Sequence, residues 1–368
     1  MTGTETDHLH DLGYDAAWGA AFAAAEVSHV AGCVDVPGRV TRTDRGACDL
    51  RGAAGSLRAT WGADVLAAVA RDPLAVPSTG DWVVVRRWPD GRVTIEAVLA
   101  RRTAVVRAQV GGTSSGQVLA ANIDVVAVVE ALVPDPDLGR IERLLALAWQ
   151  SGATPRLVLT KADLLAGGTE IAAEVAAQVG AGCAVDVTGA PDGRGVDDLL
   201  EALASGATMA LLGASGVGKS TLLNALVGRV ELMRTQSLGA VHKGRHTTVT
   251  RELHLVPGGG CVIDTPGLRS VGLVGEDAIA DVFSDVDQMA SRCRFSDCAH
   301  GVEPGCAVRA ATESGELPKR RLQSWDKLRR EAAWQAGRVD ARLRQEQLRV
   351  WKQRTRAARQ GPTRGAWP

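Results

Sequence analysis

The hydrophobic and polar positions divide the chain into regions of different pattern. Residues 38–107 contain short alternating runs such as GRVTRTD, SLRATW and DWVVVRRW, which predict strands. The Asp90-Gly91 pair separates WVVVRRW from RVTIEAV, and this dipeptide favours the positive φ of a hairpin turn. We therefore expect a small β-barrel over residues 38–110. It follows an N-terminal extension, residues 1–37, to which the pattern assigns no function.

A second pattern follows the Gly/Ser-rich segment GGTSSGQ at residues 111–117. Apolar runs such as IDVVAVVEA, RLVLT and TMALLG alternate with helical stretches such as LGRIERLLALAWQ and KSTLLNALV. This alternation predicts βαβ units around a mainly parallel sheet. We expect a multidomain fold, in which the α/β domain covers residues 117–287, a cysteine-containing helical module covers 288–335, and a basic helical tail covers 336–368.

A phosphate-binding loop is predicted between the strand-like MALLG and the helical KSTLLNALV, because the segment matches the pattern G-x-x-x-x-G-K-S. Backbone N–H groups of such a loop converge on phosphate oxygens. Lys219 would neutralise phosphate charge and Ser220 would bind Mg²⁺. The full pattern disfavours a glycine-rich turn without a ligand. The predicted nucleotide-binding residues here are Gly213, Ala214, Ser215, Gly216, Val217, Gly218, Lys219, Ser220 and Thr221.

Two switch motifs are expected beyond this loop. Asp264 ends the apolar run CVI and opens the motif DTPG, which places a carboxylate near Mg²⁺ and the Gly267 amide near the γ-phosphate. Thr247 and Thr248 lie in a polar stretch, and one of them is the candidate switch I ligand of Mg²⁺ and the γ-phosphate. The spacing leaves open which threonine binds. It also leaves open that the pair only begins the strand TRELHLV.

The sequence also predicts a guanine site. In Thr160-Lys161-Ala162-Asp163, after the strand-like RLVL, the Asp163 carboxylate would accept hydrogen bonds from guanine, whereas adenine would leave it facing an acceptor. GTP is therefore favoured over ATP. Thr188 belongs to a small-residue loop after another strand, where the base would be cradled. Thr160 stands where Asn is usual, which would soften base selectivity.

The base motifs precede the phosphate-binding loop, the reverse of the usual order in GTPases. A permuted chain can keep the same spatial site, because chain ends can be rejoined at surface loops without disturbing the core. In this order the DTPG motif leads directly into the C-terminal module. We therefore hypothesise that the nucleotide state repositions that module.

A metal site is predicted in the C-terminal module. The ligands Cys293, Cys298, His300 and Cys306 follow one another with spacings of four, one and five residues. Three cysteines and one histidine suffice for a tetrahedral structural Zn²⁺ site with no open position. The alternative, three buried thiols near a surface histidine, is disfavoured because so polar a loop cannot readily bury them.

Charge is distributed unevenly although the formal net charge is zero. Fifteen Lys and Arg residues against four Asp and Glu residues give residues 319–368 a net charge of +11. A basic segment favours nucleic acid, and its interleaved tryptophans suit RNA. An amphipathic helix that packs its tryptophans on the zinc module is an equal alternative. No stretch reaches the roughly 20 apolar residues that span a bilayer, so we expect a cytoplasmic protein without a membrane partner.

Together these segments resemble the ribosome-small-subunit-dependent GTPase A family of permuted GTPases. The resemblance covers about residues 38–330 and rests on VLARRTAVVR, AANIDVV, TKAD, GASGVGKST, GRHTT, DTPG and CRFSDCAHGVEPGCAV. It implies that the barrel is an OB-fold contacting rRNA and that 30S subunits stimulate GTP hydrolysis. Leu268 replaces the glutamine that many GTPases carry after DTPG, so slow intrinsic turnover is implied. The resemblance maps a catalytic role onto His246.

The leading prediction is thus a monomeric GTPase that uses GTP with Mg²⁺, carries one structural Zn²⁺ and acts late in 30S maturation. A second hypothesis is a GTP-regulated RNA-binding module or RNA chaperone whose GTP hydrolysis is incidental. A third is a P-loop ATPase or kinase unrelated to ribosomes.

Overall fold

The computed structural model describes residues 9–107, 116–180, 182–189, 193–228, 251–265 and 277–339. Its strands are β1 (Val34–Asp44), β2 (Ala47–Gly52), β3 (Gly55–Trp61), β4 (Trp82–Arg87), β5 (Val93–Val98), β6 (Ala104–Arg107), β7 (Gln117–Ala121), β8 (Val125–Ala131), β9 (Thr154–Thr160), β10 (Ala184–Val187), β11 (Thr208–Leu212), β12 (Glu252–Leu255) and β13 (Cys261–Asp264). Its α-helices are α2 (Ala16–Ala23), α3 (Ala63–Arg71), α4 (Leu138–Gln150), α5 (Gly168–Val179), α6 (Asp197–Leu203), α7 (Lys219–Val227), α8 (Asp277–Val282), α9 (Ser284–Ala290), α10 (Ala307–Ser314) and α11 (Lys319–Val339). Three 3₁₀ turns are η1 (Pro73–Ala75), η2 (Ala162–Leu164) and η3 (Ala204–Gly206).

The N-terminal strands form a closed barrel in the order β1-β2-β3-β5-β4, and β1 pairs with β4 to close it. Side chains such as Val40, Leu50 and Ile95 fill its core, because alternate residues of a strand point inward. Gly91 has a φ of +85° in the β4–β5 turn, which confirms the predicted hairpin. Five strands closed in this way are the architecture of an OB-fold.

The strand β6 lies outside this barrel, although its sequence was expected at the barrel's end. It pairs with β7 in a separate two-stranded sheet. It also contacts the GTPase domain, where the Ala104 N–H donates to the carbonyl of Ser151, the residue after α4, at 3.0 Å. This hairpin therefore connects the barrel to the next domain.

The second sheet carries the predicted α/β domain. Its order is β10-β9-β8-β11-β13-β12, in which the first five strands run parallel and β12 is antiparallel to β13. Alternation along β8 assigns Val126 and Val128 to the core that contains α4 and α5. Val125 and Val129 pack instead with α6 and α7. Helices therefore cover both faces of the sheet, and the strand ends remain open for a site.

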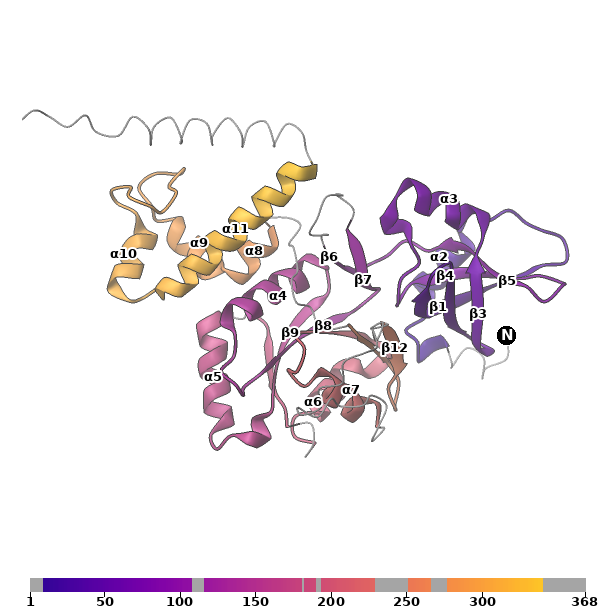
Figure 1. The fold of residues 1–368 in the computed structure, drawn as a ribbon, viewed down its shortest axis with the longest axis horizontal. Coiled ribbons are helices and arrows are strands. Elements are labelled where there is room, and N and C mark those ends of the chain that lie inside the picture. The colour runs from indigo at the N-terminus through magenta and orange to yellow at the C-terminus, as the bar shows by residue number, and fades with distance from the viewer. Residues whose placement is uncertain are drawn as a thin grey trace, which may run out of the picture.

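The barrel and the C-terminal helices lie at opposite ends of the molecule, with the GTPase sheet between them (Figure 1). The barrel joins this sheet through β1 and β12, where Arg42 pairs with Glu252. At the other end α8 packs against α4, and Arg143 of α4 forms an ion pair with Glu331 of α11 at 2.6 Å. Among the described residues, no helix is long and apolar enough to cross a bilayer.

Candidate nucleotide and metal sites

The predicted phosphate-binding loop connects β11 to α7, as the sequence indicated. A Cβ at Gly213 would lie 2.4 Å from the Val129 carbonyl oxygen, so the close approach of the loop to β8 requires glycine. Gly218 has a φ of +97° immediately before α7 begins, which again favours glycine. Ser220 and Thr221 follow in the first turn of α7. The first-turn N–H groups of α7 therefore open towards the loop, as an anion site requires.

Lys219 and Asp264 form the charged centre of this site. Lys219 is buried, and its Nζ donates to the carbonyl oxygens of Gly213 at 3.0 Å and Ala214 at 2.7 Å. Burial lowers the pKa of Lys219, while the charges of Asp264 and Glu130 raise it. Asp264 lies at the end of β13 opposite Leu211 of β11, which brings it beside the loop.

The Asp264 carboxylate fits a Mg²⁺ site. Burial raises its pKa to about 6, against the lowering effect of Lys219. Its Oδ1 is buried and has no hydrogen-bond partner in the described part of the chain. A buried carboxylate oxygen normally has a partner. Water bound to a Mg²⁺ ion would supply one here, because hard cations of this kind keep several waters in phosphate sites.

The first base loop follows β9. Lys161 has a φ of +62°, and its Nζ donates to the Val133 carbonyl at 3.3 Å. Asp163 is exposed at the sheet edge. The Thr160 hydroxyl donates to the Val217 carbonyl of the phosphate-binding loop. Thr160 therefore connects the base loop to the phosphate-binding loop, a contact that its position in the motif did not reveal.

The second base loop lies against the first. The Thr188 N–H donates to the Leu159 carbonyl at 2.8 Å, and the Ala162 N–H donates to the Thr188 carbonyl at 3.2 Å. The Thr188 hydroxyl is buried and has no hydrogen-bond partner in the described residues. Parallel strands β8, β9, β10, β11 and β13 thus bring both base loops, the phosphate-binding loop and Asp264 to one edge of the sheet.

Four predicted site residues lie outside the described residues. They are His246, Thr247, Thr248 and Gly267, and Leu268 lies there too. The choice between the two threonines and the catalytic role of His246 therefore stay predictions.

The sequence did not predict one ion pair beside the phosphate-binding loop. Glu130 at the end of β8 is buried, and its carboxylate accepts hydrogen bonds from Arg140 at 2.8 Å and 2.6 Å. Arg140 lies in the first turn of α4, so the pair joins the strand to the helix beside Lys219. The sequence did contain a signal for this pair, because Glu130 is the one charged residue in the apolar run VVAVVEALV.

The four predicted metal ligands converge in the C-terminal module. All their ligand atoms lie within 4.8 Å of one another. His300 Nδ1 lies 3.6 Å from Cys293 Sγ and 3.5 Å from Cys306 Sγ, and the two sulfur atoms are 3.9 Å apart. Tetrahedral zinc bonding sets these separations at about 3.6 Å for S···N and about 3.8 Å for S···S. The cluster therefore has the dimensions of a tetrahedral metal site.

The surroundings hold this cluster in place. Cys306 caps α10, and its Sγ accepts from the Arg309 N–H at 3.4 Å. Glu303 accepts from the backbone N–H groups of Gly301 at 2.8 Å and Ala299 at 3.3 Å, which fixes the loop between the ligands. The Trp325 ring of α11 is buried, with its centre 5.4 Å from that of His300.

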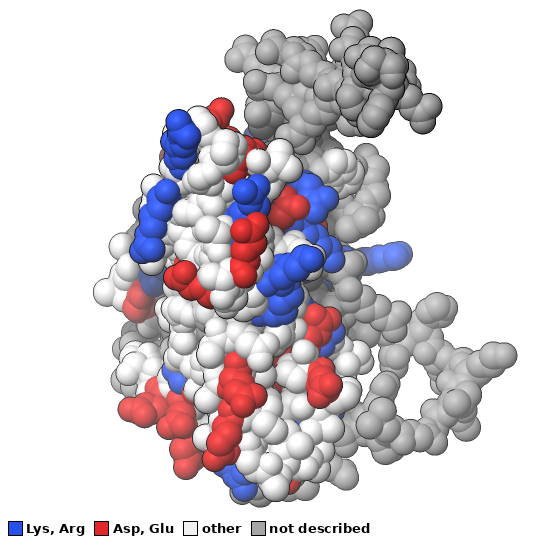
Figure 2. All heavy atoms as spheres, turned by 90° about the vertical axis from the view of Figure 1, so that its left-hand side faces the viewer, with Lys and Arg blue, Asp and Glu red and all other residues white. Residues whose placement is uncertain are grey.

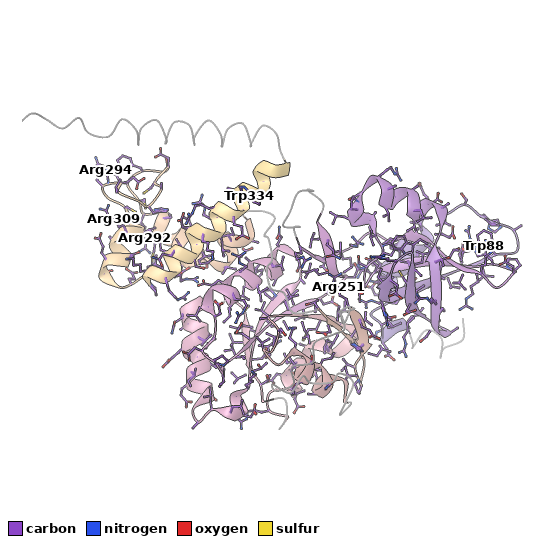
Figure 3. All side chains as sticks on the ribbon, viewed as in Figure 1. Trp88, Arg251, Arg292, Arg294, Arg309 and Trp334 are labelled. Carbon is purple, nitrogen blue, oxygen red and sulfur yellow. The ribbon has the colours of Figure 1, made fainter. Side chains whose placement is uncertain are left out.

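The tryptophans of the basic segment differ in role. Trp325 packs on the metal module, as the helix-packing alternative expected. Trp334, also on α11, is half exposed, and Figure 3 labels it farther along that helix. Trp351 and Trp367 lie outside the described residues.

Basic and acidic side chains are distributed unevenly over the surface. In Figure 2 blue side chains gather mostly in the upper half of the face, over the C-terminal module, while the lower half over the GTPase domain is mainly red. Figure 3 places Arg292, Arg294 and Arg309 around the metal-binding loop. Arg292 and Arg294 are exposed, and Phe295 beside them is 41% exposed. The module thus presents cations next to an open aromatic ring.

The fold and the site together define a circularly permuted P-loop GTPase whose C-terminal module carries a Cys₃His cluster of metal-ligand dimensions. A family model described as RsgA GTPase matches residues 98–274. Two relatives named small ribosomal subunit biogenesis GTPase RsgA, from Streptomyces avermitilis and Streptomyces coelicolor, are each 46% identical over 96% of this chain. The matches cover 94% and 95% of the relatives. The chain belongs to the RsgA GTPase family.

Solved structures agree with this assignment. YjeQ from Thermotoga maritima superposes with a TM-score of 0.58 at 25% identity, over 81% of this chain and 99% of that one. YloQ, described as a circularly permuted GTPase, superposes with a TM-score of 0.57 over 83% of this chain and 97% of that one. At 21% identity YloQ supports the fold alone. The expected family and fold class are confirmed.

Proposed function

We propose that this GTPase acts in the late maturation of the 30S small ribosomal subunit, which stimulates its hydrolysis of GTP to GDP and phosphate. The main support is the 46% identity, along 96% of the chain, to proteins named for small ribosomal subunit biogenesis. Because the matches span nearly the full length of this chain and of both relatives, they favour a shared partner as well as a shared fold. A monomer in the cytoplasm suits this role.

The nucleotide roles follow from the geometry of the sheet edge. Lys219 would neutralise β- and γ-phosphate charge, Ser220 with Thr247 or Thr248 would bind Mg²⁺, and Asp264 would orient water around the metal. Asp163 would select guanine. His246 would orient the attacking water. Since Leu268 offers no side-chain hydrogen bond, intrinsic turnover would be slow.

The metal role follows from the donor set. Three thiolates and one imidazole select Zn²⁺, and four protein ligands leave no position for substrate. The ion would therefore be structural, stabilising the loop between α9 and α10.

RNA contact is supported by two surfaces at opposite ends of the molecule. On the β4–β5 hairpin, the guanidinium of Arg92 lies 4.7 Å from the centre of the Trp88 ring, labelled in Figure 3. On the C-terminal module, Arg294 lies 5.5 Å from the centre of the Phe295 ring. Cations beside accessible aromatic rings suit phosphates and unstacked bases. The barrel domain (38–110) and the zinc module (288–335) would thus hold rRNA on either side of the GTPase domain (117–287).

The test compares GTP and ATP hydrolysis by the purified protein, with and without 30S subunits. We expect slow GTP turnover that rises by orders of magnitude with the subunit, and little turnover of ATP. Lys219→Ala should abolish the stimulated rate, whereas Glu174→Ala, at an exposed position on α5, should not. A subunit that changes nothing would contradict the partner, and equal competition by ATP would contradict the base.

The rival function, a GTP-regulated RNA-binding module, is separated by a variant that binds GTP without hydrolysing it. His246→Ala is the candidate. If cells carrying it mature their small subunits normally, while the purified variant binds GTP and lacks stimulated turnover, hydrolysis is incidental. Full stimulated turnover in the variant would instead reject the catalytic role of His246.

A further inference from the structure

The barrel and the GTPase sheet meet in one row of residues. Glu252 of β12 is in register with Arg42 of the barrel strand β1 on one side and with Asp264 of β13 on the other. Neighbouring strands of a sheet lie about 4.8 Å apart, so two strand spacings, about 10 Å, separate the backbone of β1 from that of Asp264. The carboxylate that fits a Mg²⁺ site is therefore close to the barrel.

A buried threonine of the barrel domain makes a second contact at this row. The Thr79 side chain is buried, and its hydroxyl donates to the carbonyl oxygen of Arg251 at 3.3 Å. Arg251 directly precedes Glu252, and Figure 3 labels it between the barrel and the GTPase sheet. In the sequence Arg251 follows the predicted switch I threonines, Thr247 and Thr248, by four and three residues. Thr79 therefore holds the backbone at the point where β12 begins.

Thr79 belongs to a loop that is braced on several sides. This junction loop, residues 76–81, connects η1 to β4. Arg101 donates to both carboxylate oxygens of the buried Asp81, at 2.8 Å and 2.7 Å. The N–H of Ala121, at the end of β7, donates to the Thr79 carbonyl at 3.0 Å. The backbone and the side chain of Thr79 are thus both bonded to the GTPase domain.

At Gly80 the junction loop packs directly on the GTPase domain. Gly80 has a φ of +96°, and a Cβ there would lie 2.1 Å from the Ala121 carbonyl oxygen. Its N–H donates to the Val40 carbonyl of β1 at 2.9 Å, and its carbonyl accepts from Arg39 at 3.3 Å. A left-handed backbone with both polar groups bonded has few alternatives. The neighbouring Thr79 is therefore fixed relative to both domains.

The junction loop is also connected to the barrel hairpin for which RNA contact is proposed. β4 begins at Trp82, directly after this loop, and ends at Arg87, the residue before Trp88. Six residues of strand, about 20 Å, thus separate the loop from the Trp88 and Arg92 pair. β4 pairs with β1 on one side and β5 on the other, so it moves with the barrel as a unit. A force on the hairpin would therefore reach the junction loop.

We propose that Thr79 is a positioning residue for GTP hydrolysis, whose hydroxyl sets the backbone of Arg251 according to the position of the barrel. A threonine hydroxyl has one proton, and Thr79 donates it to a backbone carbonyl, so the residue acts through Arg251 and not on the nucleotide. RNA bound to the barrel would thereby place the predicted switch I threonines for hydrolysis. The role rests on the proposed function, because it supplies the step between subunit binding and the nucleotide site.

The test compares Thr79→Val with native protein, because valine keeps the shape of threonine and removes the hydroxyl. GTP turnover is measured with and without saturating 30S subunits, together with KM for GTP and the affinity for the subunit. We expect the stimulated kcat to fall about tenfold or more, since slight misplacement of catalytic groups has effects of this size. KM for GTP, intrinsic turnover and subunit affinity should change less than about twofold, as expected when only the stimulated transition state is affected.

Two further substitutions isolate the hydroxyl. Thr79→Ser and Thr79→Ala both remove the methyl group, but only serine keeps a hydroxyl. Serine should therefore retain the stimulated kcat, and alanine should lose it. The matched control is Thr43→Val, because the Thr43 hydroxyl donates to the Pro77 carbonyl of the same loop, from the barrel side, at 3.1 Å. This control should lower the melting temperature and retain the stimulated kcat.

The outcomes separate this role from the proposed function. Native protein that 30S subunits do not stimulate would contradict both. If native protein is stimulated, an unchanged stimulated kcat in Thr79→Val, or a loss that weaker subunit binding explains, refutes the role of Thr79 alone. An equal loss in Thr43→Val, or in Thr79→Ser, refutes it too, since the effect would then come from loop stability or packing and not from the hydroxyl.

Discussion

The guanidinium of Arg321 on α11 donates a hydrogen bond to the Glu142 carboxylate on α4 across 3.0 Å. Both side chains are almost wholly buried. Arg321 also forms an ion pair with Asp285 of α9 at 2.6 Å and donates to the carbonyl oxygens of Val179 and Val282. One side chain of α11 thus contacts α4, α5, α8 and α9. Arg321 belongs to the basic segment 319–368, but it is buried and its charge stabilises the protein interior, so it does not face a nucleic acid.

Replacing Arg321 by alanine should destabilise the protein strongly. The substitution leaves the buried Glu142 carboxylate with Arg320, at 3.0 Å, but without Arg321. It also removes the ion pair with Asp285 and the hydrogen bonds to two carbonyl oxygens, and because breaking a buried pair costs about 3–5 kcal/mol, we expect a loss of about 3 kcal/mol. Chemical unfolding followed by far-UV circular dichroism measures the loss. The control is Arg330→Ala, which removes an exposed ion pair with Asp326 on the same helix and should change little. Equal effects of the two substitutions would contradict the structural role of Arg321.

The nucleotide state should change hydrogen exchange in α11 if the permuted order couples the site to the module. The segment after Asp264 leads into α8, whose last carbonyl, at Val282, accepts from Arg321 at 2.8 Å. Movement at the nucleotide would therefore reach α11 through this contact. We expect amide exchange in α11 to differ between the GDP form and a GTP-analogue form. Identical exchange in both forms would reject the coupling.

Asp163→Asn should change base selectivity. The carboxylate accepts from the ring N–H and the amine of guanine, whereas an amide can donate to the carbonyl that xanthine carries in place of that amine. We expect GTP affinity to fall about 100-fold or more and XTP to bind better than GTP. Fluorescent nucleotide displacement measures both. Asp197→Asn, an exposed aspartate at the start of α6, is the charge control. Unchanged GTP affinity would remove Asp163 from the base site.

Native protein should contain one zinc per chain, and a strong chelator should unfold the C-terminal module. Structural zinc contributes folding free energy directly. Cys306→Ser should lose the metal, as measured by elemental analysis, while GTP binding persists because the nucleotide site lies on another domain. Cys183→Ser is the matched control, since Cys183 precedes β10 away from the cluster. Full zinc content in Cys306→Ser would contradict the ligand set.

The Asp15–Arg102 pair should make stability depend on acid pH. Its hydrogen bonds to Arg102 lower the pKa of Asp15 from 3.8 to about 2. A lowered folded-state pKa stabilises the protein above the unfolded pKa, and this contribution is lost as the pH falls from about 4 to about 2. Asp15→Asn keeps the cap of α2 and removes the charge.

The melting temperatures of Asp15→Asn and native protein should therefore differ at neutral pH and converge near pH 2. Asp64→Asn, at an exposed position in the first turn of α3, should show no such convergence. A constant difference between Asp15→Asn and native protein across this range would refute the assignment.

Local patterns in the sequence determined much of this protein. The phosphate-binding loop, the base loops and the cysteine cluster each depend on residues close together in the chain, so spacing alone predicted them. Alternation with periods of two and of 3.6 residues predicted α4 and α7 at their observed bounds. The hairpin at Gly91 required only a local φ preference.

Only the tertiary structure decided the contacts between segments distant in the chain. Arg321 meets Glu142 because α11 packs against α4, and Thr160 meets Val217 because β9 and the phosphate-binding loop share one edge of the sheet. Arg42 pairs with Glu252 because β1 of the barrel docks on β12 of the GTPase sheet. A charge or hydroxyl in the sequence looks the same whether it is solvated or buried. The physical reason is that burial and partner geometry arise from packing of the whole chain, which no local pattern contains.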